Sequence, residues 1–472
     1  MTHAGVRAGR PGGTGLAGTG PPGTGLAGTG AARRSRRRPV EWATTPGRLW
    51  LLLVGMVTLS LAWGALSSFT AVRYSSSASA VVTTRERLSL DAQQIYSDLS
   101  DANDAAATAF LAPGPEPAAT RTRYARDISA ASAGIEQVTA LGGGGTGTAG
   151  QDLAVLAQDL PGYTQEIGDA EADNRVGLPV GAAYLREASG LMRGGTAELT
   201  PQGPGLLPAA QDLYAAENAS LKNGSAQATG LPLVLVTLVA GLAAGYLLYR
   251  ASRWLHGRTN RVVNVGLAAA GILLAVSLTW LAAAYLGARS DLLAAQARGS
   301  ATVEAVANAT IAVQEAHADE SLTLIDNTGN DSYQKDYAAQ VQALGPGSGT
   351  LLSAAASAAA GTPAGPAVTA AVSDAKAWFA DHVTLRTLDT HGQHQAAVAS
   401  ALGTGPNAAG TAFARLSDDL AAAIHRDQAV FNSTAPAAAS AYTAVAGVTV
   451  AAGLLMAAAC AWGLSRRLAE YR

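Results

Sequence analysis

The stretch "DNRVGLPVGAAYLREASGLMR" at 173–193 carries the side chains best suited to hold a small ligand. Guanidinium groups form paired hydrogen bonds with carboxylates, so Arg175 and Arg186 suit the carboxylate of an amino acid or an acidic protein surface. Tyr184 and Arg193 lie in the same stretch and complete this candidate ligand or partner site. Solvated arginines on the face of a helical bundle would give the same pattern, and that alternative stays open.

Other reactive groups form no recognisable catalytic constellation. His391 and His394 in "HGQH" would share a helix face, but no carboxylate or third ligand accompanies them to define a metal site. The Gly/Pro tract at 13–30 follows no strand and precedes no GK[ST], which excludes a phosphate-binding loop. A single cysteine, Cys460, excludes an intrachain disulfide. We therefore expect a protein that is not an enzyme and that holds no cofactor or metal.

Four long apolar stretches without Asp, Glu, Lys or Arg predict membrane-spanning helices, which need about 20 residues each. They lie at 49–71, 231–249, 263–286 and 442–463, with Trp or Tyr near their ends, as interfacial anchors. Ion pathways usually show as ionisable residues inside the spans, so their absence argues against a transporter. The "GLAAG" at 241–245 has the small-residue spacing that allows close contact between helices in a bilayer.

Basic charge predicts the orientation of the spans. Residues 1–48 hold eight arginines, 250–262 hold four and 464–472 hold three, against only two acids, Glu41 and Glu470. The two long segments between spans carry 17 Lys and Arg but 32 Asp and Glu. Because cytoplasmic loops are enriched in Lys and Arg, both termini should lie in the cytoplasm and the protein should be a multi-pass protein of the cell membrane. The predicted order is a disordered basic cytoplasmic arm (1–48), a first span (49–71), a first extracytoplasmic bundle (72–230), a second span (231–249), a cytoplasmic loop (250–262), a third span (263–286), a second extracytoplasmic bundle (287–441), a fourth span (442–463) and a cytoplasmic tail (464–472).

The two outer segments read as helices throughout. Ala and Gly dominate the composition, and apolar residues recur at steps of three and four from Leu88 to Phe110. Breakers such as "APGPEP" and "LGGGGTGTAG" divide each segment into helices, and Gly177, Pro179 and Gly181 should interrupt the third helix. The fold class expected is therefore an all-α membrane protein with four transmembrane helices and two tandem extracytoplasmic four-helix bundles. The first and last helices of each bundle should continue from the spans without a break.

An internal duplication is the simplest explanation of this layout. "LSDANDAAATAFLA" at 99–112 aligns with "VQEAHADESLTLID" at 313–326, an offset of about 214 residues. Identity is low, however, and a chance alignment of Ala-rich helices is the alternative. The region 173–193 has lost its proline and both arginines in the second half, so the two bundles need not share a ligand.

The short inner loop is the expected transmission contact, because it joins the second and third spans. Trp254 and Leu255 are expected to be exposed apolar residues on a basic loop, flanked by Arg253 and Arg258. That composition suits an anchor for a protein partner or for the lipid interface. The "RRSRRR" at 33–38 is also better explained by contact with anionic membrane lipid than by nucleic acid.

Residues 49 to about 465, and the stretch 173–193 in particular, resemble the GlnX-type membrane proteins of actinobacteria. The outer bundles also resemble the sensor domains of chemoreceptors and histidine kinases, although the long cytoplasmic output domains of those proteins are missing. The resemblance implies a relay, in which an extracytoplasmic solute-binding lipoprotein detects amino acids such as aspartate or glutamate. It further implies that a cytoplasmic serine/threonine kinase receives the signal. A homodimer is a further expectation, and an envelope scaffold that organises a complex without sensing is the alternative function.

Overall fold

The computed structural model describes residues 45–469, except 113–115, 144–146, 177–179, 195–202, 260–263, 296–300, 327–330, 346 and 404–407. The described part contains fourteen α-helices, one π-helical turn and no strand, which confirms the predicted all-α fold class. Leu49–Arg472 form one compact unit. The other unit, Met1–Arg48, is described only from Thr45, so most of the predicted disordered arm lies outside the described residues.

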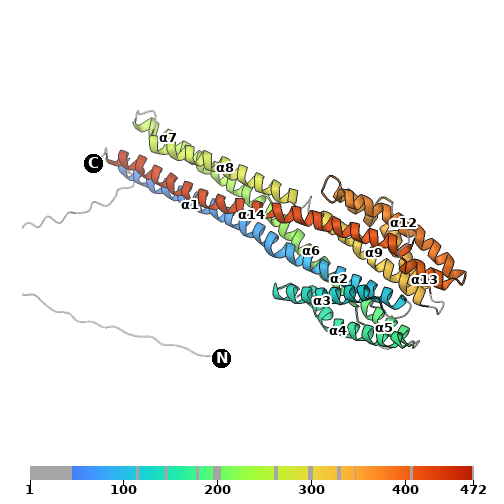
Figure 1. The fold of residues 1–472 in the computed structure, drawn as a ribbon. Helices are drawn as coiled ribbons and strands as arrows, with labels where there is room; N and C mark the ends of the chain where they lie inside the picture. The colour runs from blue at the N-terminus through green and yellow to red at the C-terminus, as the bar shows by residue number, and fades with distance from the viewer. Residues whose placement is uncertain are drawn as a thin grey trace, which may run out of the picture. The chain divides into compact units, whose positions relative to one another are not determined.

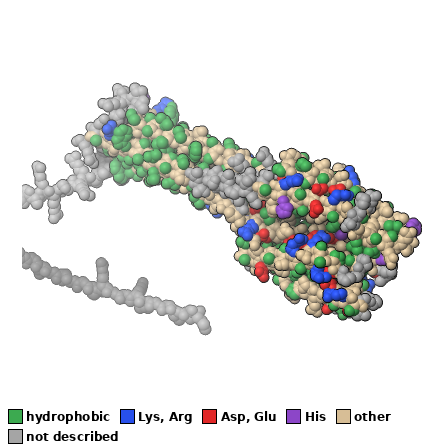
Figure 2. All heavy atoms as spheres, viewed as in Figure 1, with side chains coloured by type: hydrophobic (Ala, Val, Ile, Leu, Met, Phe, Trp, Pro, Cys, Tyr) green, Lys and Arg blue, Asp and Glu red, His purple; other side chains and the backbone are tan. Residues whose placement is uncertain are grey.

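Four helices are long and apolar enough to cross a membrane, within Gly47–Ser77, Leu206–Gly257, Val265–Ser290 and Val445–Arg466. They belong to α1 (Thr45–Ala80), α7 (Pro232–Thr259), α8 (Val265–Ala295) and the end of α14 (Ala409–Ala469). Large apolar side chains on their outer surfaces, such as Leu242 and Ile272, are exposed by 66% and 65%. Figure 2 shows these hydrophobic side chains over the spans, whereas charged side chains gather over the opposite end of the unit. Four such helices fit a multi-pass membrane protein.

Glycines allow the spans to pack at backbone distance. A Cβ added at Gly64 of α1 would lie 3.1 Å from Gly453 Cα of α14, and one at Gly266 of α8 would lie 2.5 Å from Gly463 Cα. Asn264 caps α8 by accepting from the Gly266 amide (3.1 Å) and donates to the Gly463 carbonyl (3.1 Å). Helices without large side chains at the contact can approach closely, which is how spans associate in lipid.

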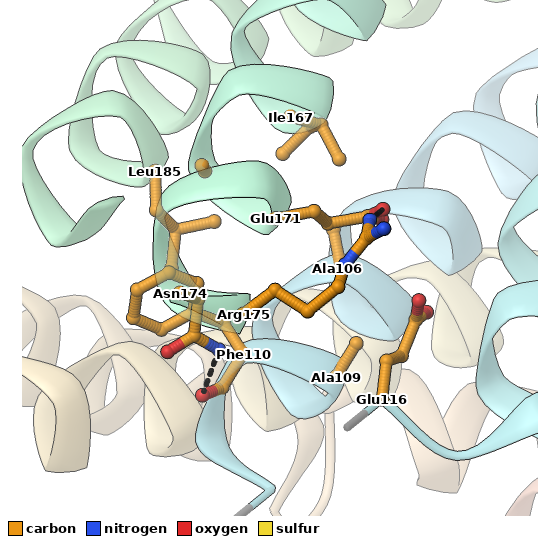
Figure 3. A pocket seen from close by; sticks show the side chains of 10 residues that line it. Ala106, Ala109, Phe110, Glu116, Ile167, Glu171, Asn174, Arg175 and Leu185 are labelled. Carbon is orange, nitrogen blue, oxygen red and sulfur yellow. Dashed lines mark hydrogen bonds and ion pairs between the residues drawn. The ribbon is translucent and has the colours of Figure 1, made fainter. Parts of the chain in front are cut away.

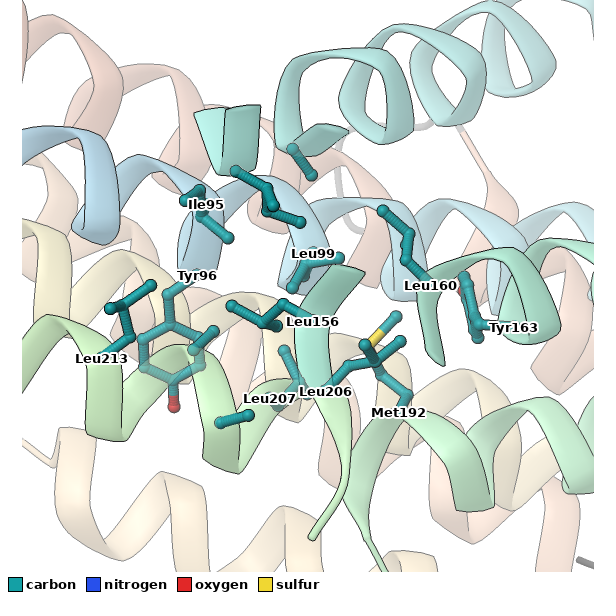
Figure 4. Close-up of a cluster of buried hydrophobic side chains, with 14 of the residues drawn as sticks. Ile95, Tyr96, Leu99, Leu156, Leu160, Tyr163, Met192, Leu206, Leu207 and Leu213 are labelled. Atoms are coloured by element: carbon teal, nitrogen blue, oxygen red, sulfur yellow. The ribbon is translucent and has the colours of Figure 1, made fainter. Parts of the chain in front are cut away.

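The first module consists of α2 (Glu86–Leu111), α3 (Ala118–Ala140), α4 (Thr148–Arg175), α5 (Gly181–Arg193) and α6 (Leu206–Thr229). The helix α4 ends just before the predicted Gly/Pro cluster and α5 begins at Gly181, which confirms the interruption of the third helix. Leucine and aromatic side chains from α2, α4 and α6 fill one core around Leu99, Leu156 and Tyr163, each at most 1% exposed (Figure 4). Burial of such side chains contributes roughly 1.5–3 kcal/mol each.

The second module consists of α9 (Ala301–Ile325), α10 (Ser332–Leu344), α11 (Leu351–Ala359), α12 (Gly365–Thr390), α13 (His394–Leu402) and residues 409–429 of α14. Alanines such as Ala371 and Ala375 pack around the fully buried Trp378, and leucines such as Leu385 and Leu416 complete the core. The break between α10 and α11 falls at the predicted "GPGSG". The break between α12 and α13 was not predicted; Gly392 makes that turn with a φ of 77°, in the left-handed region that favours glycine.

The junctions between the modules and the spans differ from one another. The helix α1 passes through a π-helical turn, η1 (Val81–Arg85), directly into α2, and α14 runs 61 residues from the second module through its span (Figure 1). The predicted continuity is wrong for α6 and α7, which are separated by Gly230 and Leu231. The reason is Pro232, because the residue before a proline disfavours helical backbone. The junction of α8 with α9 includes 296–300, outside the described residues.

The broken junction is tied to its neighbours instead. Tyr74 of α1 donates to the Gly230 carbonyl (2.6 Å), and Arg289 Nε of α8 donates to the Thr229 carbonyl (3.0 Å). Tyr285 of α8 also donates to the Thr229 carbonyl (3.0 Å). These donors satisfy carbonyls that the end of α6 leaves without helical partners.

Candidate functional site

The two modules meet along α2 and α9, which lie side by side. Three polar pairs recur at one separation of 213 residues: Asp101 with Gln314 (2.9 Å), Asp104 with His317, and Thr108 with Ser321 (3.5 Å). The stretches that align in the sequence, 99–112 and 313–326, therefore lie against each other. Two like modules related by a twofold axis along these helices would give the same pairing.

Arg123 of α3 brings a positive charge into this interface. Its guanidinium donates to Asp101 Oδ2 through Nε (3.0 Å) and to Asp104 Oδ2 through Nη2 (3.0 Å). Burial alone raises the pKa of Asp101, but the hydrogen bonds and charge of Arg123 hold that pKa below its ordinary value. Asp104 is 0% exposed, and its charge is compensated by this guanidinium and by His317, whereas Asp101 also lies 3.9 Å from the exposed guanidinium of Arg126.

Two buried histidine–carboxylate pairs involve histidines of the second module: His317 pairs with Asp104 of the first module, and His382 pairs with Glu320 of the second. The imidazole of His317 stacks on Phe413 with 3.6 Å between ring centroids. Burial opposes its charge, but Asp104 outweighs that cost and raises the pKa of His317. His382 Nδ1 lies 2.5 Å from Glu320 Oε2, and the imidazole ring of His382 stacks on the ring of Tyr337.

These buried pairs carry no role predicted from the sequence. The available signal was the density of acids and one histidine in 99–112 and 313–326, positions where an otherwise apolar helix face must bury charge.

Arg186 and Arg193, predicted as ligand-binding residues, bind carboxylates of the second module. Arg193 Nη1 lies 3.4 Å from Asp336 Oδ2, and Arg193 is also paired with the buried Asp319. Arg186, two helical turns before Arg193 on α5, has its Nη1 3.8 Å from Asp326 Oδ1. The expected chemistry of an arginine at a carboxylate is present, and the carboxylates belong to the chain itself.

Arg175 and Tyr184 do not join these two arginines. Arg175 is exposed, lies 3.9 Å from Glu171 and lines a small hollow with Phe110 and Glu116 (Figure 3). This hollow holds about 20 Å³, the space of one water molecule. Tyr184 is exposed on α5. The four predicted residues therefore do not converge on one pocket.

The predicted transmission residues lie at the end of α7 rather than in a loop. Helix continues through Thr259, and Leu255 is 3% exposed, so the expectation of an exposed apolar pair is wrong for Leu255. Trp254 is half-buried against the packed spans, and Arg253 is exposed. The side chain of Arg258 lies outside the described residues.

Within the described ranges, no three His, Cys, Asp or Glu side chains gather in a way that could hold a metal ion. Of the "HGQH" pair, His394 Nδ1 lies 2.9 Å from Asp389 Oδ1, and His391 is exposed at the turn after α12.

Comparison with known families gives one match. Residues 77–226 match the family model described as "Actinobacterial sensor domain". This range begins in the last turn of α1 and covers η1 and nearly all of the first module. No curated protein and no solved structure matches the chain. The first module is thus similar to actinobacterial sensor domains, a likeness that indicates a sensing role for a chain with four helices able to span a membrane.

Proposed function

We propose that the protein is a non-enzymatic transmembrane sensor and transducer. It detects an amino acid outside the cytoplasm, or a binding lipoprotein that carries one, and relays that signal to a cytoplasmic partner such as a serine/threonine kinase. The observation that carries the proposal is the helical continuity from the modules into the spans, along α1–η1–α2 and along α14. At 1.5 Å per residue, the 61 residues of α14 extend about 90 Å, so a shift at one end displaces the other.

The contact between the modules is suited to rearrangement. Its polar pairs, such as Asp101 with Gln314 and Thr108 with Ser321, can exchange partners with water or with a ligand. Polar interfaces inside one chain commonly permit relative motion, in contrast to large hydrophobic ones. The π-helical turn η1 lies where such motion would enter the first span, and π-turns often mark functional positions in helices.

The receiving side of the relay is the cytoplasmic face, with both termini inside, as the arginine distribution supports. Arg253 and Trp254 at the end of α7, together with the last turns of α14, form the contact for the partner. In α14 the guanidinium of Arg466 lies 4.5 Å from the ring centroid of Trp462, which orders this end of the helix.

Inserting flexible residues into η1 tests whether the signal passes along this helix. Inserting Gly-Gly-Ser between Thr83 and Thr84 interrupts the helix at an exposed position, so it should leave the first module folded and uncouple it from its span. Cells are shifted from amino-acid-free medium to aspartate and glutamate, and the cytoplasmic proteins recovered with the full-length protein are quantified by mass spectrometry. Wild type should change its recovered partners after the shift, and the η1 insertion should abolish that change.

The control is the same insertion between Gly347 and Ser348, in the exposed connection of α10 and α11, which should respond like wild type. An η1 insertion that responds fully would reject helical transmission. A wild-type protein whose partners never change would instead favour the scaffold.

A further inference from the structure

A large groove lies between the two modules, beside the contact of α2 with α9. It measures about 1090 Å³ and is bounded by α2 and α3 of the first module and by α9, α13 and α14 of the second. We call it the α3–α14 groove; among its polar lining residues are Asp98, Asp101, Arg126, Asp127, Gln314 and His425. Its size is slightly above the usual range of small-molecule sites, which is about 300–1,000 Å³.

A second groove lies on the other side of the same helix pair. It measures about 600 Å³ and is lined by residues of α2 and α6 on one side and of α9, α10 and α11 on the other. By the sequence alignment, Asp101 corresponds to Glu315, and each lines its own groove. Asp98 and Asp127 correspond to Ala312 and Val341, so only the α3–α14 groove has this pair of additional carboxylates.

Asp98 has a carboxylate oxygen that no donor of the described protein reaches. The residue is 8% exposed; its Oδ1 accepts from Gln94 Nε2 (2.7 Å), and its Oδ2 has no hydrogen-bond partner. A buried carboxylate oxygen without a donor costs free energy, and donors from a bound ligand would recover it.

Asp127 repeats this arrangement from α3. It is 4% exposed, and its Oδ1 accepts from Arg126 Nε (2.9 Å). No hydrogen-bond donor among the described residues reaches its Oδ2, and the carboxyl groups of Asp127 and Asp101 are close enough to share a proton. Two carboxylates in contact require either a shared proton or a cation.

The net charge of the groove is negative, which suits a ligand that donates hydrogen bonds to these carboxylates. Four lining carboxylates, those of Asp98, Asp101, Asp127 and Asp418, face two lining arginines, Arg123 and Arg126, which leaves a formal charge of −2 when the two lining histidines are counted as neutral. Arg123 is moreover paired with Asp101 and with Asp104, a buried residue that does not line the groove. A net-negative groove with unpaired acceptors favours a ligand that brings positive charge and N–H donors.

We propose that the α3–α14 groove binds a small organic cation through a primary ammonium group held by Asp98 and Asp127. The ligand would contact both modules at once, since Gln314 and His425 line the opposite wall. Its effect on the inner face rests on the proposed sensing function, whereas binding itself does not.

Protonation of the two carboxylates provides a test of this site. Burial raises the pKa of Asp98 to about 6, and burial together with Asp101 raises the pKa of Asp127 to about 7. Without ligand, these raised pKa values contribute stability at low pH, which is lost as the pH rises through 6 and 7. An ammonium ligand requires the ionised forms, so its affinity should increase from pH 5.5 to pH 8. The other titratable groups facing the groove are Asp101 on α2, Arg123 and Arg126 on α3, His317 on α9, and Asp418 and His425 on α14.

The experiment is calorimetric titration of the full chain in lipid nanodiscs with three five-carbon probes of different charge. They are the diamine cadaverine, its neutral diol analogue, and the dianion glutarate. We expect heat of binding with cadaverine alone, and tighter binding at pH 8 than at pH 5.5. Asp98→Asn keeps the side-chain volume but removes the charge and should weaken cadaverine at least about tenfold, the scale of one charge-assisted hydrogen bond.

The matched control is Glu304→Gln in the second groove, which should bind cadaverine like wild type. Circular dichroism and the probe-free melting temperature establish that each variant is folded. Equal binding of the diol, binding of glutarate instead, or unchanged affinity in a folded Asp98→Asn variant would overturn the proposal. If cadaverine binds through Asp98 but the recovered cytoplasmic partners do not change, the binding site is supported and the proposed signalling function is rejected.

Discussion

Replacing Arg123 by alanine is expected to lower the free energy of unfolding of the first and second modules by roughly 3–5 kcal/mol. The substitution leaves Asp101 and the fully buried Asp104 without the guanidinium that each accepts from at 3.0 Å. A buried ion pair contributes little net stability when intact, but removal of one partner leaves an uncompensated charge, which is strongly destabilising. Denaturant titration of the full chain, followed by tryptophan fluorescence and circular dichroism, measures the loss.

Arg121→Ala is the matched control, on the same helix and with the same atoms removed. The Arg121 side chain is 57% exposed and pairs with Glu116 at 2.9 Å, so its loss should cost at most about 1 kcal/mol. Adding Asp104→Asn to Arg123→Ala should cost less than the sum of the two single changes, because one of the two carboxylates that lose the guanidinium is then neutral. Equal costs for Arg121→Ala and Arg123→Ala would show that the interface charges are solvated rather than buried.

Gly266→Ala is expected to destabilise the packing of the spans by roughly 1–3 kcal/mol. The new methyl group would lie 2.4 Å from the Ala459 carbonyl oxygen and 2.5 Å from Gly463 Cα, and neither backbone atom can move without separating α8 from α14. Separation would also lengthen the hydrogen bond from Asn264 to the Gly463 carbonyl. Unfolding of the protein in mixed micelles with increasing denaturing detergent measures this effect.

Gly271→Ala on the same helix is its control. A Cβ at Gly271 meets nothing within 4 Å, so alanine there should be neutral or stabilising by up to about 1 kcal/mol through helix propensity. If the two alanine variants unfold alike, the close approach of α8 and α14 does not exist in the folded protein.

Local patterns predicted the helices better than their ends. The third-helix interruption followed from Gly177, Pro179 and Gly181, and the break between α10 and α11 from "GPGSG". The helix that contains the second predicted span continues past Tyr249, although its arginines predict a cytoplasmic loop from residue 250. Ala244, Leu248, Ala251 and Leu255 continue the helical period across that point and are all buried, so packing extends the helix through Thr259.

The candidate site depended on information that a single helix does not contain. The sequence marked arginines at 173–193 as carboxylate-binding, and Arg186 and Arg193 do bind carboxylates, but those of α9 and α10. Similarly, "GLAAG" suggested close packing, and Gly241 does lie against Trp63 and Leu278, yet the backbone contacts occur at Gly64, Gly266, Gly453 and Gly463. Which faces of two helices meet is decided by the whole arrangement of modules and spans, so Asp104 and His317, which come from the two aligned stretches, gave no sign that they would touch.

The most direct test of the relay is to lock the two modules together. Thr108 Oγ1 and Ser321 Oγ lie 3.5 Å apart across the interface, so Thr108→Cys with Ser321→Cys places two thiols within reach of a disulfide. The natural Cys460 is buried in the spans and is separate from this pair. Each single-cysteine variant serves as a control for the substitutions themselves.

The measurement is the change in cytoplasmic proteins recovered with the full chain when aspartate and glutamate are supplied outside the cell. We predict that the oxidised double-cysteine protein is folded and inserted but does not change its partners, and that reduction of the disulfide restores the wild-type change. An oxidised protein that responds as fully as wild type would contradict the account, since the signal would then pass without movement between the modules.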